Sequence, residues 1–264
     1  MIKILAVIFI LLLYLIGRGR GIITFKSLCL NVAVLCSLIL FISWGWNPVL
    51  VTFPCCLIIC YITLFYQNGR NAKTLASFSA VILVLILLFA LSYYIGYVCH
   101  LGGINEILRN EDEIAMLSPD IDISMVQIAV SVIITGLIGA EMDASISVSS
   151  AVYEVYINNR ELNLSELFKS GLHIGSDILG ATMNTLYFAC LGESLTLFIL
   201  FKNYHYSFFE VINSKAFCQE FVIILFSCLA CVLVVPLTAA SISYILKNLN
   251  QFEKYLLDEE LFSV

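Results

Sequence analysis

The sequence predicts an all-α protein, a polytopic transmembrane helix bundle of about seven helices with one cytoplasmic interfacial amphipathic helix. Hydrophobic residues make up 61% of the 264 residues and charged residues 12%, and the mean hydropathy is +1.00. Soluble domains carry about 25% charged residues, so this composition is typical of a protein that is embedded in lipid. The apolar residues also gather into runs close to the roughly 20 residues that a helix needs to cross a bilayer.

Seven apolar runs of roughly spanning length follow one another along the chain. They cover residues 4–16, 22–44, 48–66, 75–99, 124–153, 178–201 and 217–246. The first run is short enough to be a signal peptide, but Arg18, Arg20 and Lys26 follow it directly and no small-residue cleavage site precedes them. We therefore expect residues 1–246 to form one transmembrane domain, followed by a cytoplasmic tail at 247–264.

Positive charge alternates between successive connections. Lys and Arg gather at 18–26, 70–73 and 160–169 and again after residue 246, whereas the connections at 45–47, 102–122 and 203–214 carry few. Lys202 and Lys215, which border the last of these, fit the pattern least well. Basic connections stay on the cytoplasmic side, so we expect the amino terminus outside and the carboxyl terminus inside.

Two polar segments lie between the predicted spans. The connection at 102–122 contains six acidic residues and one Arg; it is either a solvated cap or a vestibule that attracts cations. Residues 163–172 carry their large apolar side chains on one helical face, and Asn163 and Glu166 resemble the start of a capping box. We expect this segment to form the interfacial helix, either as a simple connector or as part of a gate.

The predicted helix at 124–153 carries two carboxylates, Glu141 and Asp143, near its middle. Small and polar residues recur along it at helical spacing and form one stripe: Gly136, Ala140, Asp143, Ser147, Ser150 and Glu154. A carboxylate at membrane depth costs about 2.5–3.5 kcal/mol on insertion scales, so we expect this stripe to face protein or a water-filled cavity. Glu141 lies about 200° round the helix from Asp143 and must contact a different neighbour. Asp143 is the first candidate for a functional group, and structural pairing is the alternative.

A second stripe of small and polar residues occupies the next predicted helix. It consists of His173, Gly175, Asp177, Gly180, Ala181, Asn184 and Thr185. Small residues let helices approach closely, and amides and hydroxyls can then hydrogen-bond across the contact. The stripe is therefore either a packing surface or part of a proton or substrate path with Asp143, Glu141 and Glu154. In the last run, Pro236 removes a backbone donor and predicts a kink, which is typical both of transport paths and of ordinary membrane helices.

Several chemistries have no support in the sequence. There is no G-x-S-x-G, H-E-x-x-H or P-loop motif, and the three histidines lie far apart. Cys228 and Cys231 form a C-x-x-C without a second pair, and most of the 10 cysteines lie in apolar runs as small hydrophobic residues. The net charge of −6 and the absence of a basic run argue against nucleic acid as a partner. We expect the lipid bilayer as partner, no enzymatic activity, no cofactor and no metal.

Two segments resemble the signature region, here 124–201, of the YibE/F-like bacterial membrane proteins. They read GLIGAEMDASISVSSAVYEV and ELFKSGLHIGSDILGATMNTLYFACLGESL. The positions that correspond to the family pattern are Gly136, Gly139, Met142, Asp143, Gly171, Ile174, Gly175, Asp177, Asn184 and Thr185. Glu141 stands where the pattern implies an uncharged residue. The resemblance implies a multi-pass protein of the bacterial cell membrane, and it supplies no established activity.

The order of these elements also resembles, more distantly, one half of the SecDF and RND-type membrane domains. Those domains couple proton flow to work through membrane-buried carboxylates. The polar stripe with its desolvated carboxylate favours a transporter or permease subunit of unknown substrate in which Asp143 gains and releases a proton; the alternative is a non-transporting assembly or scaffold subunit. Because RND-type domains have two related halves, we expect a dimer, with a related YibE/F-like chain rather than with itself. The helix-packing positions Gly136, Gly139, Ala140, Gly180 and Ala181 can accept close contact either within the chain, as in a self-contained monomer, or with another copy.

Overall fold

The computed structural model describes residues 1–99, 101–102 and 124–248, and these residues are helical with short connections. The predicted acidic cap and the tail lie almost entirely outside the described residues. The elements, in chain order, are α1 (Ile2–Ser43), α2 (Pro48–Tyr61), the π-helical η1 (Ile62–Tyr66), α3 (Ala72–Val98), α5 (Met125–Asn158), α6 (Leu164–Asn203), α7 (Phe208–Asn213) and α8 (Lys215–Lys247).

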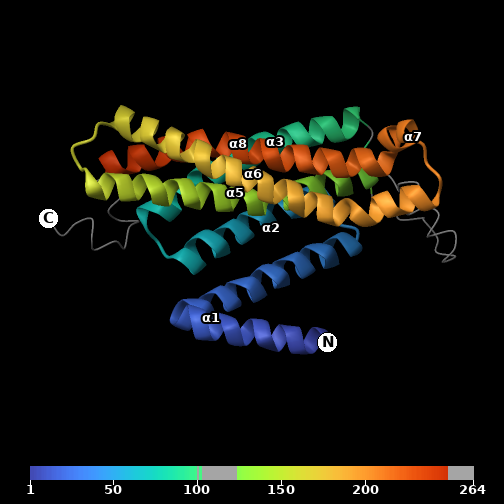
Figure 1. The fold of residues 1–264 in the computed structure, drawn as a ribbon, viewed down its shortest axis with the longest axis horizontal. Helices are drawn as coiled ribbons and strands as arrows, with labels where there is room; N and C mark the ends of the chain where they lie inside the picture. Colours follow the sequence, from blue (N-terminus) through green and yellow to red (C-terminus); the bar gives the residue numbers. More distant parts are fainter. Residues whose placement is uncertain (100, 103–123, 249–264) are drawn as a thin grey trace.

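Six of the described helices are long and apolar enough to cross a membrane: α1, α2 together with η1, α3, α5, α6 and α8. This confirms the all-α polytopic bundle. The first two predicted runs are the two arms of α1, because the chain reverses direction at Arg18, whose backbone has φ 46° and ψ −127° (Figure 1). Glycines on both sides of Arg18 make this turn accessible to the chain.

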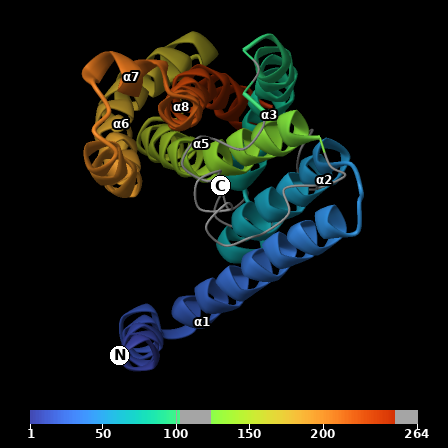
Figure 2. The ribbon, with the colours of Figure 1, turned by 90° about the vertical axis from the view of Figure 1, so that its right-hand side faces the viewer.

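Helix α5 lies at the centre of the bundle and packs against α2, α3, α6 and α8 (Figures 1 and 2). Its buried apolar residues, including Ile134 and Leu137, join Leu85 and Leu88 of α3 and Val234 of α8 in one core cluster. Helix α1 packs mainly on α2 and η1, and its first arm lies apart from the other helices (Figure 2). The structure is therefore organised around α5.

The connections rich in Lys and Arg lie at one end of the bundle. The turn inside α1, the η1–α3 connection, the α5–α6 connection and the end of α8 are all at the left of Figure 1. There the Lys247 ammonium donates to the carbonyl of Arg160 at 3.1 Å, and the Lys73 ammonium lies 4.4 Å from the centre of the Tyr153 ring. We call this the basic end, marked by Arg18, Lys73, Arg160 and Lys247. Which side of a membrane it faces stays a prediction.

Helix α6 begins as predicted but continues much further. The backbone N–H of Asn163 donates to the Glu166 carboxylate at 2.8 Å, which is half of a capping box. The helix then runs without interruption to Asn203, so residues 163–172 are its first turns and not a separate interfacial helix. The reason is tertiary packing, because Leu167 in this segment is completely buried against the bundle. Helix α8 likewise continues through Pro236 to Lys247.

The short helix α7 connects α6 to α8 at the end opposite the basic end (Figure 1). Its first turn is capped, since the Ser207 backbone N–H donates to the Glu210 carboxylate at 2.6 Å. This hydrogen bond lowers the pKa of Glu210.

Close packing at Gly171 predicts that even one methyl group there destabilises the bundle. A Cβ at Gly171 would lie 2.8 Å from Cγ2 of Val152 and 2.9 Å from Cβ of Ala239, so α6 would have to move away from α5 and α8. Overpacking of this kind costs about 1–3 kcal/mol. We expect Gly171→Ala to lower the Tm of the purified protein in detergent.

The matched control is Gly192→Ala, since nothing lies within 4 Å of a Cβ at this helical position. Alanine favours the helix over glycine there, so the Tm of this variant should be equal to or above that of the native chain. Equal Tm changes in both variants would contradict the packing described for Gly171.

Candidate functional site

Glu141 is the one charged side chain that is fully buried among the described residues, with 0% exposure. Neither of its carboxylate oxygens has a hydrogen-bond partner. It lies close to the middle of α5, roughly 25 Å from each end at 1.5 Å per residue. Glu141 is therefore a carboxyl group held near the midpoint of a long candidate spanning helix without a compensating donor.

The surroundings of Glu141 are apolar or weakly polar. The buried thiols of Cys56 and Cys60 on α2 and of Cys231 on α8 are close enough to interact electrostatically with its carboxyl. No group of His, Cys, Asp and Glu in the described part of the chain is arranged to hold a metal ion.

Four buried hydroxyl groups lie between Glu141 and the basic end, and the first of them, Ser145, is one helical turn from Glu141 on the same face of α5. Ser145 Oγ is 2.8 Å from Thr238 Oγ1, and Ser77 Oγ is 2.8 Å from Ser149 Oγ. The Ser145 hydroxyl also donates to the carbonyl of Ser77 at 3.4 Å. All four side chains have 0% exposure. We call them the hydroxyl cluster; it joins α3, α5 and α8.

Toward the opposite end, the same face of α5 is apolar. Ile138 and Ile134 follow Glu141 in that direction, and Leu88 of α3 is buried in the same cluster. Two contacts give the register between α3 and α5, which run antiparallel. Ser77 of α3 meets Ser149 of α5, and a Cβ at Gly96 of α3 would lie 2.8 Å from Cγ2 of Val130 on α5. Glu141 thus lies at a boundary, with hydroxyl groups on one side of it and packed aliphatic side chains on the other.

The predicted stripe on α5 lies elsewhere. Gly136, Asp143, Ser147 and Glu154 are exposed on the single chain, and Ala140 is only partly buried. The expectation that this stripe faces protein is wrong for this chain taken alone. The reason is that both faces of α5 carry small and polar residues, and the face with Glu141, Ser145 and Ser149 is the one that packs against α3 and α8.

The predicted stripe on α6 is exposed except at Gly175, which is buried against α5 and α8. The other members lie on the surface of the chain, as does Gly139 of α5: His173, Asp177, Gly180, Ala181, Asn184 and Thr185. A Cβ at Gly171 would touch Val152 and one at Gly175 would touch Val148, so α5 and α6 run antiparallel and Gly180 lies at about the depth of Asp143. The structure therefore brings neither stripe into contact with the buried Glu141.

The hydroxyl cluster was missed by the sequence prediction. Its signal on α5 is the four-residue spacing of Glu141, Ser145 and Ser149, which places all three on one helical face. The partners Ser77 and Thr238 lie 72 and 93 residues away along the chain, and nothing in the sequence pairs them.

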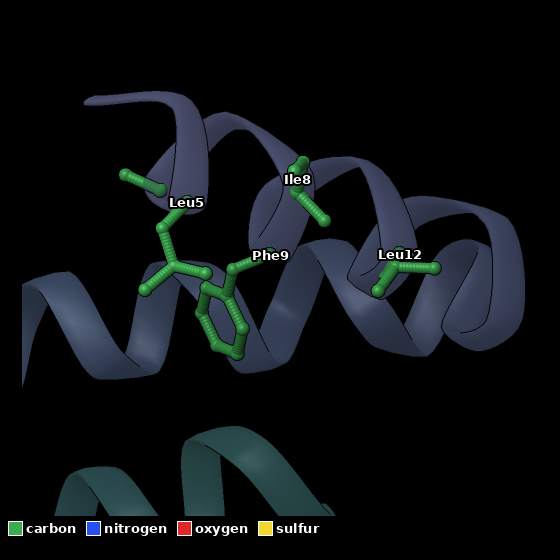
Figure 3. Close-up of a pocket in the computed structure, with 5 residues that line it drawn as sticks. Leu5, Ile8, Phe9 and Leu12 are labelled. Atoms are coloured by element: carbon green, nitrogen blue, oxygen red, sulfur yellow. The ribbon is translucent and has the colours of Figure 1, made fainter. Parts of the chain in front are cut away.

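A groove on the first arm of α1 offers no chemistry. It is lined by the apolar residues Leu5, Ala6, Ile8, Phe9 and Leu12 (Figure 3). These residues come from the arm that lies apart from the bundle (Figure 2). The groove therefore has no connection with the Glu141 site.

Comparison with known proteins gives one family. The sequence model of the family described as YibE/F-like protein matches residues 5–248, far more than the signature region alone. No curated protein and no solved structure gives a match, so the likeness to SecDF and RND-type domains stays an expectation. The match includes every helix that lines the Glu141 site, and the chain therefore belongs to the YibE/F-like protein family.

Proposed function

We propose that this multi-pass membrane protein is a transporter or permease subunit in which Glu141 takes up and releases a proton as the helices repack. The observation that carries the proposal is the complete burial of Glu141 with both carboxylate oxygens unpaired. The substrate is left open. Asp143, the first candidate from the sequence, is exposed on the chain and becomes the second candidate.

The energetic argument concerns the two protonation states. An ionised carboxylate in an apolar interior is very costly unless it is paired, whereas a neutral carboxyl group is much less so. Carboxylates inside membranes normally pair with cations or face water. Buried carboxyl groups that bind and release protons are typical of the proton relays of pumps and transporters. The packing around Glu141 suits the neutral form, because neither of its oxygens has a hydrogen-bond donor; the charged form would require a hydroxyl such as that of Ser145 to reorient toward it. A change of protonation would therefore favour a change of packing around α5.

The second candidate function is a membrane scaffold or assembly subunit. The observation that favours it is the hydroxyl cluster, whose hydrogen bonds hold α3, α5 and α8 together. Under this alternative Glu141 is part of the packing and its protonation has no role. The two functions differ in what a neutral replacement of Glu141 should do.

Glu141→Gln separates them, because glutamine has the same shape and imitates the neutral carboxyl group. We expect the variant to reach native abundance and Tm in membranes, and to lose the growth phenotype that the native gene restores in a deletion strain. The measurement is complementation, with membrane abundance determined in the same cells. Asp143→Asn is the matched control, and it should retain at least part of the function.

Native growth with Glu141→Gln would exclude the proton role. A parallel loss of growth and abundance would instead favour the scaffold, since the protein would then fail by not assembling.

We also propose that a second YibE/F-like chain covers the exposed stripes of α5 and α6. Polar groups at membrane depth are costly against lipid, and Asp143, Asp177 and Asn184 are exposed there. Nothing lies within 4 Å of a Cβ at Gly139 or Gly180, and such open small-residue positions accept a neighbouring helix. These observations support the dimer predicted from the sequence.

Gly180→Leu tests this contact. A leucine at the interface should block the close approach of a second helix, so gently solubilised membranes should yield a dimer from the native protein and mainly a monomer from the variant in native mass spectrometry. Ala90→Leu, at an exposed position on α3, is the control and should leave the dimer intact. A native monomer that retains activity would rule the dimer out.

A further inference from the structure

We propose that the hydroxyl cluster is the route by which the Glu141 carboxyl exchanges its proton with water at the basic end of the bundle. This proposal rests on the proposed role of Glu141 as a proton-binding group, and it assigns to Ser77, Ser145, Ser149 and Thr238 a role that packing alone does not require.

The first support is the geometry of the hydroxyl pairs. A hydroxyl group both donates and accepts, so a chain of them can pass a proton and then reset by rotation. In each 2.8 Å pair, Ser145 with Thr238 and Ser77 with Ser149, either oxygen can be the donor. Ser145 also donates to the backbone carbonyl of Ser77, so the two pairs lie next to each other.

The second support is the position of the cluster between Glu141 and the basic end. Ser145 follows Glu141 by one helical turn on the same face. The Glu141 oxygens have no hydrogen-bond partner in the structure, so the first transfer requires the Glu141 side chain to rotate onto Ser145. Ser149 lies about 12 Å from Glu141 along α5, and Ser77 is five residues after the start of α3 at the basic end. One turn beyond Ser149, Tyr153 is almost fully buried and lies under the Lys73 ammonium.

The third support is the contrast with the other half of the bundle. Among the described residues there, the buried hydroxyl of Ser92 donates to the carbonyl of Phe89 in its own helix, and that of Ser227 to Ile223 in its own helix. The Ser131 hydroxyl has no partner. None of these links one helix to another, so the described hydroxyl pairs lead from Glu141 toward the basic end alone.

The step conserves protons and needs no co-reactant. For release, the Glu141 carboxyl gives its proton to the Ser145 oxygen as Ser145 passes its own proton on, and the last hydroxyl gives one proton to water. Each hydroxyl ends with one proton, and the carboxyl becomes a carboxylate. Uptake is the same sequence in reverse.

The test follows the Glu141 carboxyl directly. Purified protein in lipid nanodiscs is mixed with D2O, and the infrared C=O band of protonated Glu141, identified by its loss in Glu141→Gln, is followed as it shifts on deuteration. We expect Ser145→Ala and Thr238→Val to slow this shift by at least about tenfold, a barrier increase of roughly 1.4 kcal/mol. Ser145→Thr, which keeps a hydroxyl, should restore the rate.

The matched control is Ser92→Ala, which removes a buried hydroxyl from the other half of the bundle and should leave the rate unchanged. Thermal unfolding shows whether each variant is folded. Native exchange rates in folded Ser145→Ala and Thr238→Val would overturn the route, as would equal slowing in Ser92→Ala. Loss of the carboxyl band on adding NaCl at constant pH would overturn it in favour of a sodium site. If Glu141→Gln removes no protonated-carboxyl C=O band from the spectrum, Glu141 does not hold a proton and the proposed function itself fails.

Discussion

The rest of the structure depends on one constraint, the absence of water in the interior of a bilayer. Each polar group on a spanning helix must find a partner within the protein or be exposed at a cost. In the centre of this bundle the hydroxyls of Ser77, Ser145, Ser149 and Thr238 meet that requirement by pairing across three helices. Glu141 does not meet it, although it is as deeply buried as they are. A buried carboxyl that is paired with a lysine is held in its charged form. An unpaired one is not, so its protonation is free to differ between conformations.

The constraint applies to both faces of helix α5, because both carry polar side chains. The inner face presents Glu141 and two serines to α3 and α8, and the outer face presents Asp143, Ser147 and Glu154 on the surface of the chain. The serines of the inner face find partners within the chain, whereas Glu141 does not. The same helix therefore links the buried site to the surface on which we propose a second chain, and a repacking of α5 would affect both together.

Much of the fold was predictable because hydropathy and charge act locally. The apolar runs, the alternation of basic connections and the start of α6 at Asn163 all follow from neighbouring residues, and the structure contains them. Which face of α5 is buried does not follow, since its two faces differ little in polarity and the decision lies with helices distant in sequence. The sequence therefore favoured Asp143, and the structure buries Glu141. The continuation of α6 beyond residue 172 was missed for a similar reason, because the burial of Leu167 depends on tertiary contacts.

The asymmetry about Glu141 restricts how a transport cycle could work. Hydroxyl pairs extend from it toward the basic end, while Ile134, Ile138 and Leu88 fill the space toward the other end. Opening that second half would expose aliphatic side chains, which costs about 25 cal/mol per Å² of apolar area moved into water. Closing the first half would separate hydroxyl groups that are now paired, and each would need a new partner. The two halves thus oppose change by different forces, hydrophobic packing on one side and hydrogen bonding on the other. Under the proposed function, a change of protonation at Glu141 would act on the hydrogen-bonded half and not on the hydrophobic half, and would thereby favour one packing of α3, α5 and α8 over another.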